Sequence, residues 1–117
     1  MKIIGTGIDL VEVDRIRSIA KANPAFLKRV FSPEELSYSM KSKNRWERLA
    51  ARFAAKEAVW KAIGRGGVSL IAISIRRLDN GKPEVDLAKL GLARSVRCVL
   101  SLSHTSRYAV AHCLIYR

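Results

Sequence analysis

The sequence predicts an α+β domain in which helices pack on an antiparallel β-sheet, and two patterns support this prediction. Apolar residues recur at helical spacing in most of the first half of the chain, whereas they alternate with polar residues at strand spacing towards the C-terminus. The chain has 117 residues, so it fits one domain over 1–117, because a single core usually organises about 100 to 150 residues.

The first element is predicted to be a strand over residues 2–10. Its alternation places two isoleucines on one face and Gly5, Gly7 and Asp9 on the other. Asp9 therefore projects from a face that its neighbours leave bare, where a ligand and the backbone can approach closely.

Helical segments are predicted to follow this strand. Asn23-Pro24 ends the first of them, because a proline disfavours helix in the residue before it. Ser32-Pro33-Glu34-Glu35 fits a helix start with a serine cap and a capping box, and Gly64 is a plausible stop for the longest helix. The predicted segments are 14–22, 26–31, a helix starting at 32–35, and about 45–63.

The C-terminal half is predicted to consist of antiparallel strands. Asp79-Asn80-Gly81 is a turn signal between two of them, and residues 103–107 are predicted to form the turn of a C-terminal hairpin. Residues 88–94 are ambiguous. The predicted strands are 70–78, 83–87, 96–102 and 108–116.

The charge balance indicates an acidic partner. Lysine and arginine total 22 against 10 aspartates and glutamates, which gives a formal net charge of +12. Such a field attracts polyanions and speeds their encounter with the protein. Nucleic acid, a phosphorylated cofactor and an acidic protein all fit, so the choice among them depends on the site residues.

The remaining composition indicates a soluble cytoplasmic protein without a membrane partner. No apolar run approaches the ~20 residues that cross a bilayer, and the N-terminus lacks the apolar stretch of a signal peptide. Cys98 and Cys113 lie in apolar, strand-like contexts, neither paired closely as in a zinc site nor dense as in a disulfide scaffold. Both are predicted to be buried thiols.

Two carboxylates are candidate metal ligands. Glu57 falls in the middle of a predicted buried arc of the longest helix, and a buried carboxylate must be neutralised by protonation, an ion pair or a metal. Lys61, one turn later, would satisfy Glu57 without a metal. Asp9 is the second acid, and two carboxylates with phosphate oxygens and waters form a typical Mg²⁺ site. The arc consists of Trp46, Leu49, Ala50, Phe53 and Trp60.

Several further residues have a structural interpretation when each is taken singly. Arg48, Arg52 and Lys56 share one helix flank, which is usually solvated surface. Residues 80–83 read first as a hairpin turn, and residues 103–105 offer hydroxyls and an imidazole that are more often structural than catalytic.

Together, these segments resemble the holo-acyl carrier protein synthases, the small phosphopantetheinyl transferases of bacteria. The resemblance spans nearly the whole chain, and its most specific part is the Phe-Ala-Ala-Lys-Glu segment with an upstream Gly-Ile-Asp. The matching segments are residues 7–12 (GIDLVE), 31–35 (FSPEE), 52–58 (RFAAKEA) with Lys61, 80–83 (NGKP) and 101–105 (SLSHT).

The resemblance implies that coenzyme A donates its phosphopantetheine arm to a serine of apo-acyl carrier protein, in fatty acid biosynthesis, and leaves as adenosine bisphosphate. It implies that Asp9 and Glu57 bind Mg²⁺, that Glu57 takes the serine's proton directly or through a metal-bound water, and that Lys61 is a third catalytic residue. Such chemistry needs charge neutralisation and in-line positioning more than covalent help. The implied coenzyme A contacts are Arg52, Lys56, Lys61, Asn80, Gly81, Lys82, Pro83, His104 and Thr105.

The resemblance also implies two protein contacts. Arg15, Arg17 and Lys21 of the first helix would face the acidic helix of the carrier protein, which fits the net charge of the chain. The family further implies a homotrimer with each active site between two subunits.

The alternative hypothesis is a basic, KH-like RNA-binding module. Residues 62–68 imitate the isoleucine and GXXG loop of KH domains. However, a KH loop joins two helices, whereas the alternating residues after this loop predict a strand, and RNA binding gives no reason to bury Glu57. A nucleic acid partner is therefore not expected.

Overall fold

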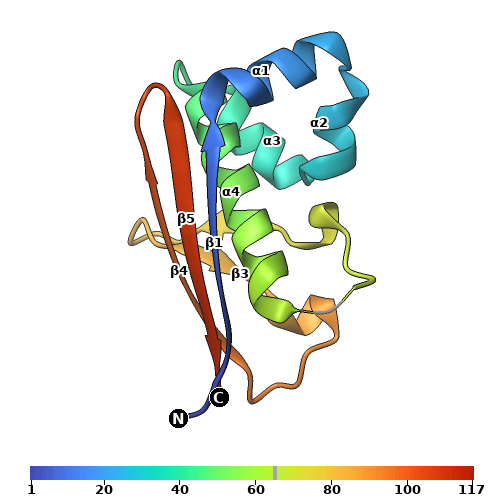
Figure 1. The fold of residues 1–117 in the computed structure, drawn as a ribbon. Helices are drawn as coiled ribbons and strands as arrows, with labels where there is room; N and C mark the ends of the chain where they lie inside the picture. The colour runs from blue at the N-terminus through green and yellow to red at the C-terminus, as the bar shows by residue number, and fades with distance from the viewer. Residues whose placement is uncertain (65) are drawn as a thin grey trace.

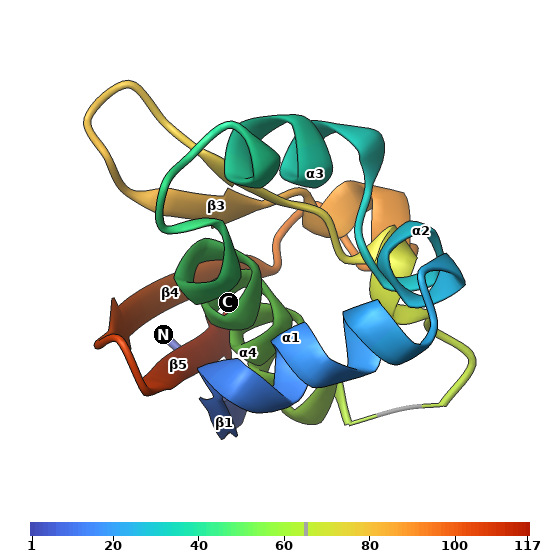
Figure 2. The same ribbon diagram turned by 90° about the horizontal axis from the view of Figure 1, so that it is seen from above.

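The computed structural model describes residues 1–64 and 66–117, and it is arranged around the helix α4. Figures 1 and 2 show the main sheet on one side of α4, with α1 on a second side and α3 with a β-hairpin on a third. The predicted α+β fold is therefore confirmed. In chain order the elements are β1 (Ile3–Glu12), α1 (Val13–Ala22), α2 (Ala25–Val30), α3 (Pro33–Met40), α4 (Arg45–Ile63), a 3₁₀ turn (Leu70–Ala72), β2 (Ile75–Arg77), β3 (Pro83–Val85), a second 3₁₀ turn (Leu87–Leu90), β4 (Arg97–His104) and β5 (Tyr108–Tyr116).

The main sheet joins the two ends of the chain. Its strand order is β1-β5-β4, with both neighbouring pairs antiparallel. Ile3 lies opposite Tyr116 and Glu12 lies opposite Tyr108, so β1 and β5 pair along nearly their full length. The predicted N-terminal strand and C-terminal hairpin are confirmed, although β4 runs to His104, beyond its predicted end.

Two glycines allow β1 to approach α4 closely. A Cβ atom on Gly7 would lie 1.9 Å from the carbonyl oxygen of Ala58, and one on Gly5 would lie 2.1 Å from the carbonyl oxygen of Ala62. No side chain fits at either position, because these are distances to backbone atoms. The bare face beside Asp9 is thus filled by the helix rather than left open for a ligand.

The helix α4 is buried over more of its circumference than one arc, because alanines such as Ala54 and Ala58 let neighbouring elements approach closely. The predicted arc is partly wrong: Trp60 is exposed, at 42%, and Glu57 is only half-buried. Both lie on the strip of α4 that the neighbouring elements leave partly open. Leu49 is fully buried, as predicted.

The predicted helix ends are confirmed. Ser32 Oγ accepts the backbone N–H of Glu35 at 3.3 Å, while the Glu35 carboxylate accepts the backbone N–H of Ser32 at 2.8 Å, so the capping box is complete. Asn23 ends α1, and Gly64 ends α4 with a φ of 69°, a conformation that glycine adopts readily.

The predicted strand over residues 70–78 is wrong for its first part. Leu70–Ala72 forms a 3₁₀ turn, and the strand β2 covers only Ile75–Arg77. The ammonium group of Lys56 donates to the carbonyl oxygens of Leu70 and Ile73 at 3.0 and 2.8 Å, so these carbonyls bind a buried cation instead of a neighbouring strand. The predicted strand over 83–87 is similarly short, because Asp86 caps a second 3₁₀ turn at the backbone N–H of Ala88.

The two cysteines lie next to each other on the sheet. Their sulfur atoms are 3.3 Å apart and both thiols are free. Cys113 is buried as predicted, whereas Cys98 is only partly buried. The hydrogen bond to Cys98, together with burial, raises the pKa of Cys113.

None of the helices in the described part of the chain combines the length and the apolar character that a membrane span requires.

Candidate functional site

An acidic cluster forms where β1 meets α4. Asp9 comes from β1, and Glu57 and Lys61 come from consecutive turns of α4. The Lys61 ammonium donates to Asp9 Oδ1 at 3.2 Å and to the backbone carbonyl oxygen of Ile8 at 2.9 Å. Lys61 therefore forms its ion pair with Asp9, not with Glu57 as the helical spacing allowed.

Glu57 is the less neutralised acid of this cluster. Burial and the negative charge of Asp9 raise the pKa of Glu57, and the positive charge of Lys61 only partly opposes them. A carboxylate whose ionised form is disfavoured by a second carboxylate beside it suits a divalent cation between the two. Within the described residues no group of three or more histidine, cysteine, aspartate or glutamate side chains converges, so Mg²⁺ here would take its remaining ligands from phosphate oxygens and water.

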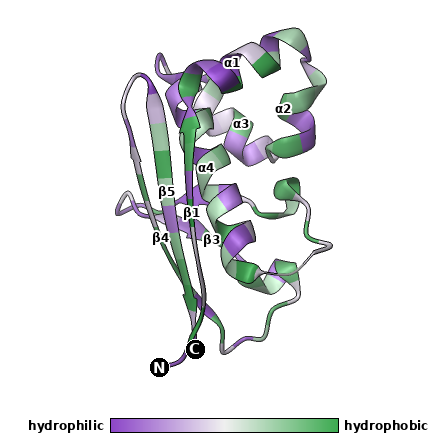
Figure 3. Ribbon diagram, in the orientation of Figure 1, coloured by the Kyte–Doolittle hydropathy of each residue, from purple (hydrophilic) through white to green (hydrophobic). Residues whose placement is uncertain are grey.

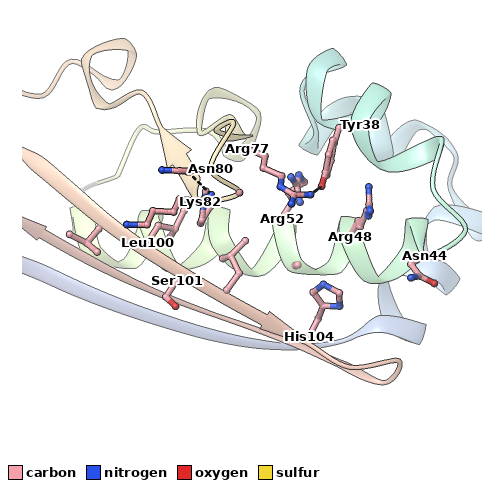
Figure 4. Close-up of a pocket in the computed structure, with 15 residues that line it drawn as sticks. Tyr38, Asn44, Arg48, Arg52, Arg77, Asn80, Lys82, Leu100, Ser101 and His104 are labelled. Atoms are coloured by element: carbon pink, nitrogen blue, oxygen red, sulfur yellow. Dashed lines mark hydrogen bonds between the residues drawn. The ribbon is translucent and has the colours of Figure 1, made fainter.

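A basic pocket of about 730 Å³ lies on the other flank of α4 (Figure 4). It is bounded by α3, α4, the β2–β3 hairpin and β4, and none of the described residues that line it carries a carboxylate. Four cations open into it, an arrangement that favours an anionic ligand. The lining residues are Tyr38, Asn44, Arg48, Ala51, Arg52, Arg77, Asn80, Gly81, Lys82, Pro83, Val99, Leu100, Ser101, Leu102 and His104.

Six of the predicted coenzyme A contacts come together in this pocket: Arg52, Asn80, Gly81, Lys82, Pro83 and His104. Asn80 Oδ1 accepts the backbone N–H of Lys82 at 3.0 Å, and Gly81 has a φ of 87°, which together shape the turn between β2 and β3. His104 Nδ1 lies 3.0 Å from a carboxylate oxygen of Glu47, which orients the imidazole. Thr105 does not line the pocket; its hydroxyl accepts two backbone N–H groups of the β4–β5 turn.

Lys56 does not face either site, so its prediction as a coenzyme A contact is corrected. The side chain is fully buried, and its ammonium lies 2.6 Å from the Glu35 carboxylate. With the carbonyls of Leu70 and Ile73, this ion pair occupies all three ammonium protons. Glu35 also accepts the backbone N–H of Ile75 at 2.9 Å, so the pair joins α3, α4 and β2 in the core.

Tyr38 and Arg77 line the pocket but were not singled out from the sequence. Tyr38 reaches the pocket from α3, and Arg77 donates to its hydroxyl from β2 at 2.8 Å. The positions of Tyr38 and Arg77 depend on how distant segments pack, so no local sequence pattern could identify them. For the arginines of α4, the flank that Arg48 and Arg52 share was the sequence feature that pointed to the pocket.

The two clusters lie on opposite sides of α4. Arg48 and Glu57 are nine residues apart, which corresponds to about 180° around a helix. In the sheet, β5 separates the strand that carries Asp9 from β4, which lines the pocket. No residue of the acidic cluster lines the pocket, so a single copy of the chain keeps the two charged sites apart.

The fold and these sites define an α+β protein with a cationic pocket on one flank of a central helix and, on the other flank, an acidic pair shared between that helix and β1. The chain matches the model of the 4'-phosphopantetheinyl transferase superfamily over residues 5–113. It is 42% identical to a holo-[acyl-carrier-protein] synthase of Solibacter usitatus, over 97% of this chain and 98% of that protein.

Solved structures agree. The crystal structure of the holo-[acyl-carrier-protein] synthase from Neisseria meningitidis superposes with a TM-score of 0.84 at 35% identity, covering 98% of this chain and 99% of that one. The synthase from Bacillus anthracis, solved in complex with CoA (3',5'-ADP), gives a TM-score of 0.82 at 35% identity, covering 98% and 97%. The chain therefore belongs to the phosphopantetheinyl transferases and, among them, to the holo-[acyl-carrier-protein] synthase family.

These comparisons do not support the alternative of a KH-like RNA-binding module. Its loop motif includes Arg65, which lies outside the described residues. After α4, the described chain continues into the 3₁₀ turn Leu70–Ala72 and the strand β2 rather than into a second long helix.

Proposed function

We propose that this protein, as one domain over residues 1–117 and in the cytoplasm, transfers the phosphopantetheine arm of coenzyme A to a serine of apo-acyl carrier protein. The reaction releases adenosine 3',5'-bisphosphate and requires Mg²⁺. The observation that carries the proposal is a pocket with four cations and no carboxylate among its described lining residues, on the opposite flank of α4 from the carboxylate pair that Glu57 of α4 forms with Asp9 of β1.

Asp9 and Glu57 would hold the magnesium ion. When bound, the ion would neutralise charge on the pyrophosphate of coenzyme A, whose phosphoanhydride bond breaks in the transfer. Lys61 holds the Asp9 carboxylate in place through its 3.2 Å ion pair. As the cation of the acidic cluster, Lys61 would also contact a phosphate group of coenzyme A there.

Glu57 would also take the proton of the attacking serine, directly or through a water. In the metal-free protein, burial and Asp9 raise the pKa of Glu57, so this carboxylate favours binding a proton or a cation. The proton would leave the serine oxygen as that oxygen bonds to the β-phosphorus of coenzyme A, and the bisphosphate would leave with the bonding electrons.

The basic pocket would bind the nucleotide end of coenzyme A. Arg48, Arg52, Arg77 and Lys82 supply positive charge, and Asn80 with its turn offers backbone and amide groups. An arginine fork matches the geometry of phosphate oxygens, so charge and shape both favour this ligand.

The helix α1 would dock the carrier protein. Arg15, Arg17 and Lys21 are all exposed, because α1 turns Val13, Ile16 and Ala20 to the core instead. Exposed cations of this kind act mainly on the rate of association with an acidic partner.

The active unit would be a homotrimer in which each site forms between two copies. The sheet face away from α4 is not covered by any described element, and it exposes Ile8 at 61%, Leu10 at 67% and Val99 at 53%. Figure 3 shows hydrophobic segments along the strands of this sheet. Association would bury this apolar face and bring the acidic cluster of one copy to the basic pocket of the next.

The test is a transfer assay with purified components. The protein is incubated with coenzyme A, Mg²⁺ and an apo-acyl carrier protein, and the carrier is weighed by mass spectrometry. The proposal predicts the mass gain of one phosphopantetheine group on the serine, with loss of the gain in EDTA. An unmodified carrier protein, despite correctly folded reactants, would contradict it.

A further inference from the structure

Tyr38 lies at the centre of an arginine cluster formed by Arg48, Arg52 and Arg77 (Figure 4). The guanidinium carbons of Arg48 and Arg52 lie 4.8 and 4.2 Å from the centre of the Tyr38 ring, within the range of cation–π interaction. Arg77 donates to the Tyr38 hydroxyl at 2.8 Å. One aromatic side chain thus contacts three cations from two different elements.

No ion pair between a described carboxylate and an arginine of this cluster forms in the structure. Arg52 is only 7% exposed, and its Nε–H has no hydrogen-bond partner among the described residues. Burial lowers the pKa of Arg52, although Tyr38 and Glu35 oppose this effect. Glu35, the acid that acts on Arg52, is already committed to Lys56 in the core. A buried arginine with an unused donor therefore faces the pocket without a carboxylate partner of its own.

The arginines also change the pKa of Tyr38. Burial raises its pKa, but the hydrogen bond from Arg77 and the charges of Arg48, Arg52 and Arg77 outweigh burial and lower the pKa overall. A neutral tyrosine can hold these cations in place without cancelling their charge, which a carboxylate at the same position would do.

We propose that Tyr38 is a positioning residue that orients Arg48, Arg52 and Arg77 to bind a phosphate group at the nucleotide end of coenzyme A. The inference rests on the proposed function and deepens it. A phosphate monoester carries close to two negative charges at neutral pH and accepts several donors at once, so it matches a cluster of uncompensated guanidinium groups. The Nε–H of Arg52 supplies a donor that the folded chain leaves for such a ligand.

The experiment compares Tyr38→Phe, which keeps the ring but removes the acceptor of Arg77, with Tyr38→Leu, which removes both. Tyr116→Phe, on β5 and outside the pocket, is the matched control. Isothermal titration measures the binding of adenosine 3',5'-bisphosphate, adenosine 5'-monophosphate and dephospho-coenzyme A. Thermal melting checks that each variant folds.

We expect Tyr38→Phe to weaken binding of the bisphosphate about threefold and Tyr38→Leu about tenfold or more, because a charge-assisted hydrogen bond and then two cation–π contacts are lost. Tyr116→Phe should bind as the wild type does. The KM for coenzyme A should rise in the same order, while kcat stays within about twofold, since the acidic cluster is untouched. The probe whose affinity changes most identifies the phosphate that the cluster binds.

A second comparison separates positioning from a general effect on the pocket. If Tyr38 acts by holding Arg77, then Arg77→Gln should weaken binding in the wild type but have little further effect in Tyr38→Phe. Should Tyr38→Leu fail to fold, the Phe variant and this cycle decide the question.

Unchanged affinity for all three probes in folded Tyr38→Phe and Tyr38→Leu would overturn the inference, as would a wild type that binds none of them. The transfer assay keeps this result distinct from failure of the proposed function. A wild type that still modifies the carrier protein would leave the proposed function standing and remove only the role of Tyr38.

Discussion

The charged residues on the two flanks of α4 have different kinds of partner. On one flank, Lys61 is paired with Asp9 beside a half-buried Glu57. On the other, Arg48 and Arg52 contact a neutral tyrosine and have no carboxylate among the described residues of their pocket. The comparison shows that the role of a helix cation is set by what other segments bring to it, and that one helix can serve an acidic and a basic site at once.

The largest effect is expected at the acidic flank. Asp9→Ala and Glu57→Ala should each lower the transfer rate about a hundredfold or more, because losing a metal ligand removes charge stabilisation worth several kcal/mol. Steady-state kinetics on carrier-protein modification measures the loss. The metal-free binding of adenosine 3',5'-bisphosphate should change little, since the basic pocket lies on the other flank.

Glu12→Ala, which removes an exposed acid from the end of β1, is the control and should leave the rate nearly unchanged. Near-normal turnover of Asp9→Ala or Glu57→Ala, or of the wild type in EDTA, would contradict the proposal that these two carboxylates bind a magnesium ion that the reaction requires.

The difference between the flanks was only partly visible in the sequence. The alternation of β1 correctly placed Asp9 with the glycines, and helical spacing placed Lys61 near enough to Glu57 to act on its charge. However, the spacing could not show that Lys61 pairs with Asp9, because that contact joins residues far apart in the chain. It also placed Glu57 too deep, since the alanine-rich faces of α4 carry most of the burial.

Lys56 shows the limit of reasoning from one helix. By spacing it shares a flank with Arg52, and both were predicted to reach coenzyme A. The structure turns Lys56 into the core because Glu35 and the carbonyl oxygens of Leu70 and Ile73 surround its ammonium. Contacts with other segments determine where the Lys56 side chain lies. The same holds for Tyr38 and Arg77, whose positions in the pocket no local sequence pattern predicted.

A smaller effect is expected from the docking helix, which belongs to neither flank. Reversing the charges of Arg15, Arg17 and Lys21 to glutamate should raise the KM for the carrier protein about tenfold at low salt, and added salt should shrink the difference. The affinity for adenosine 3',5'-bisphosphate should stay nearly constant, which titration calorimetry checks.

Reversal of Lys89, Arg94 and Arg97 makes the same change in net charge at exposed positions away from α1 and is the control. If this control raises the KM equally, or if the α1 variant loses nucleotide affinity to the same extent, then α1 is not the docking surface.

The smallest effect concerns stability at the acidic flank. The pKa of Glu57 is raised in the folded protein, so its ionisation costs more there than in the unfolded chain. This destabilisation is absent below the ordinary glutamate pKa of about 4.3, grows as pH rises through the higher folded value, and then stays constant. Glu57→Gln should therefore raise the Tm by about 1 to 3 °C at pH 7.5 in EDTA, and by less at pH 4. Equal Tm values of the wild type and Glu57→Gln at pH 7.5 would show that the surroundings of Glu57 do not disfavour its ionised form.

The central claim is that the acidic flank of one copy and the basic flank of another make one active site. Mixing two inactive variants tests it: Glu57→Ala is refolded together with an equal amount of the Arg52→Ala, Asn80→Ala double variant, and transfer is compared with each variant alone. In a cyclic trimer about one site in four regains both intact flanks, because each site needs two independent correct choices around the ring. We predict recovery of about a quarter of the wild-type rate. No recovery in mixed trimers that light scattering confirms, or a monomer by light scattering, would contradict the claim.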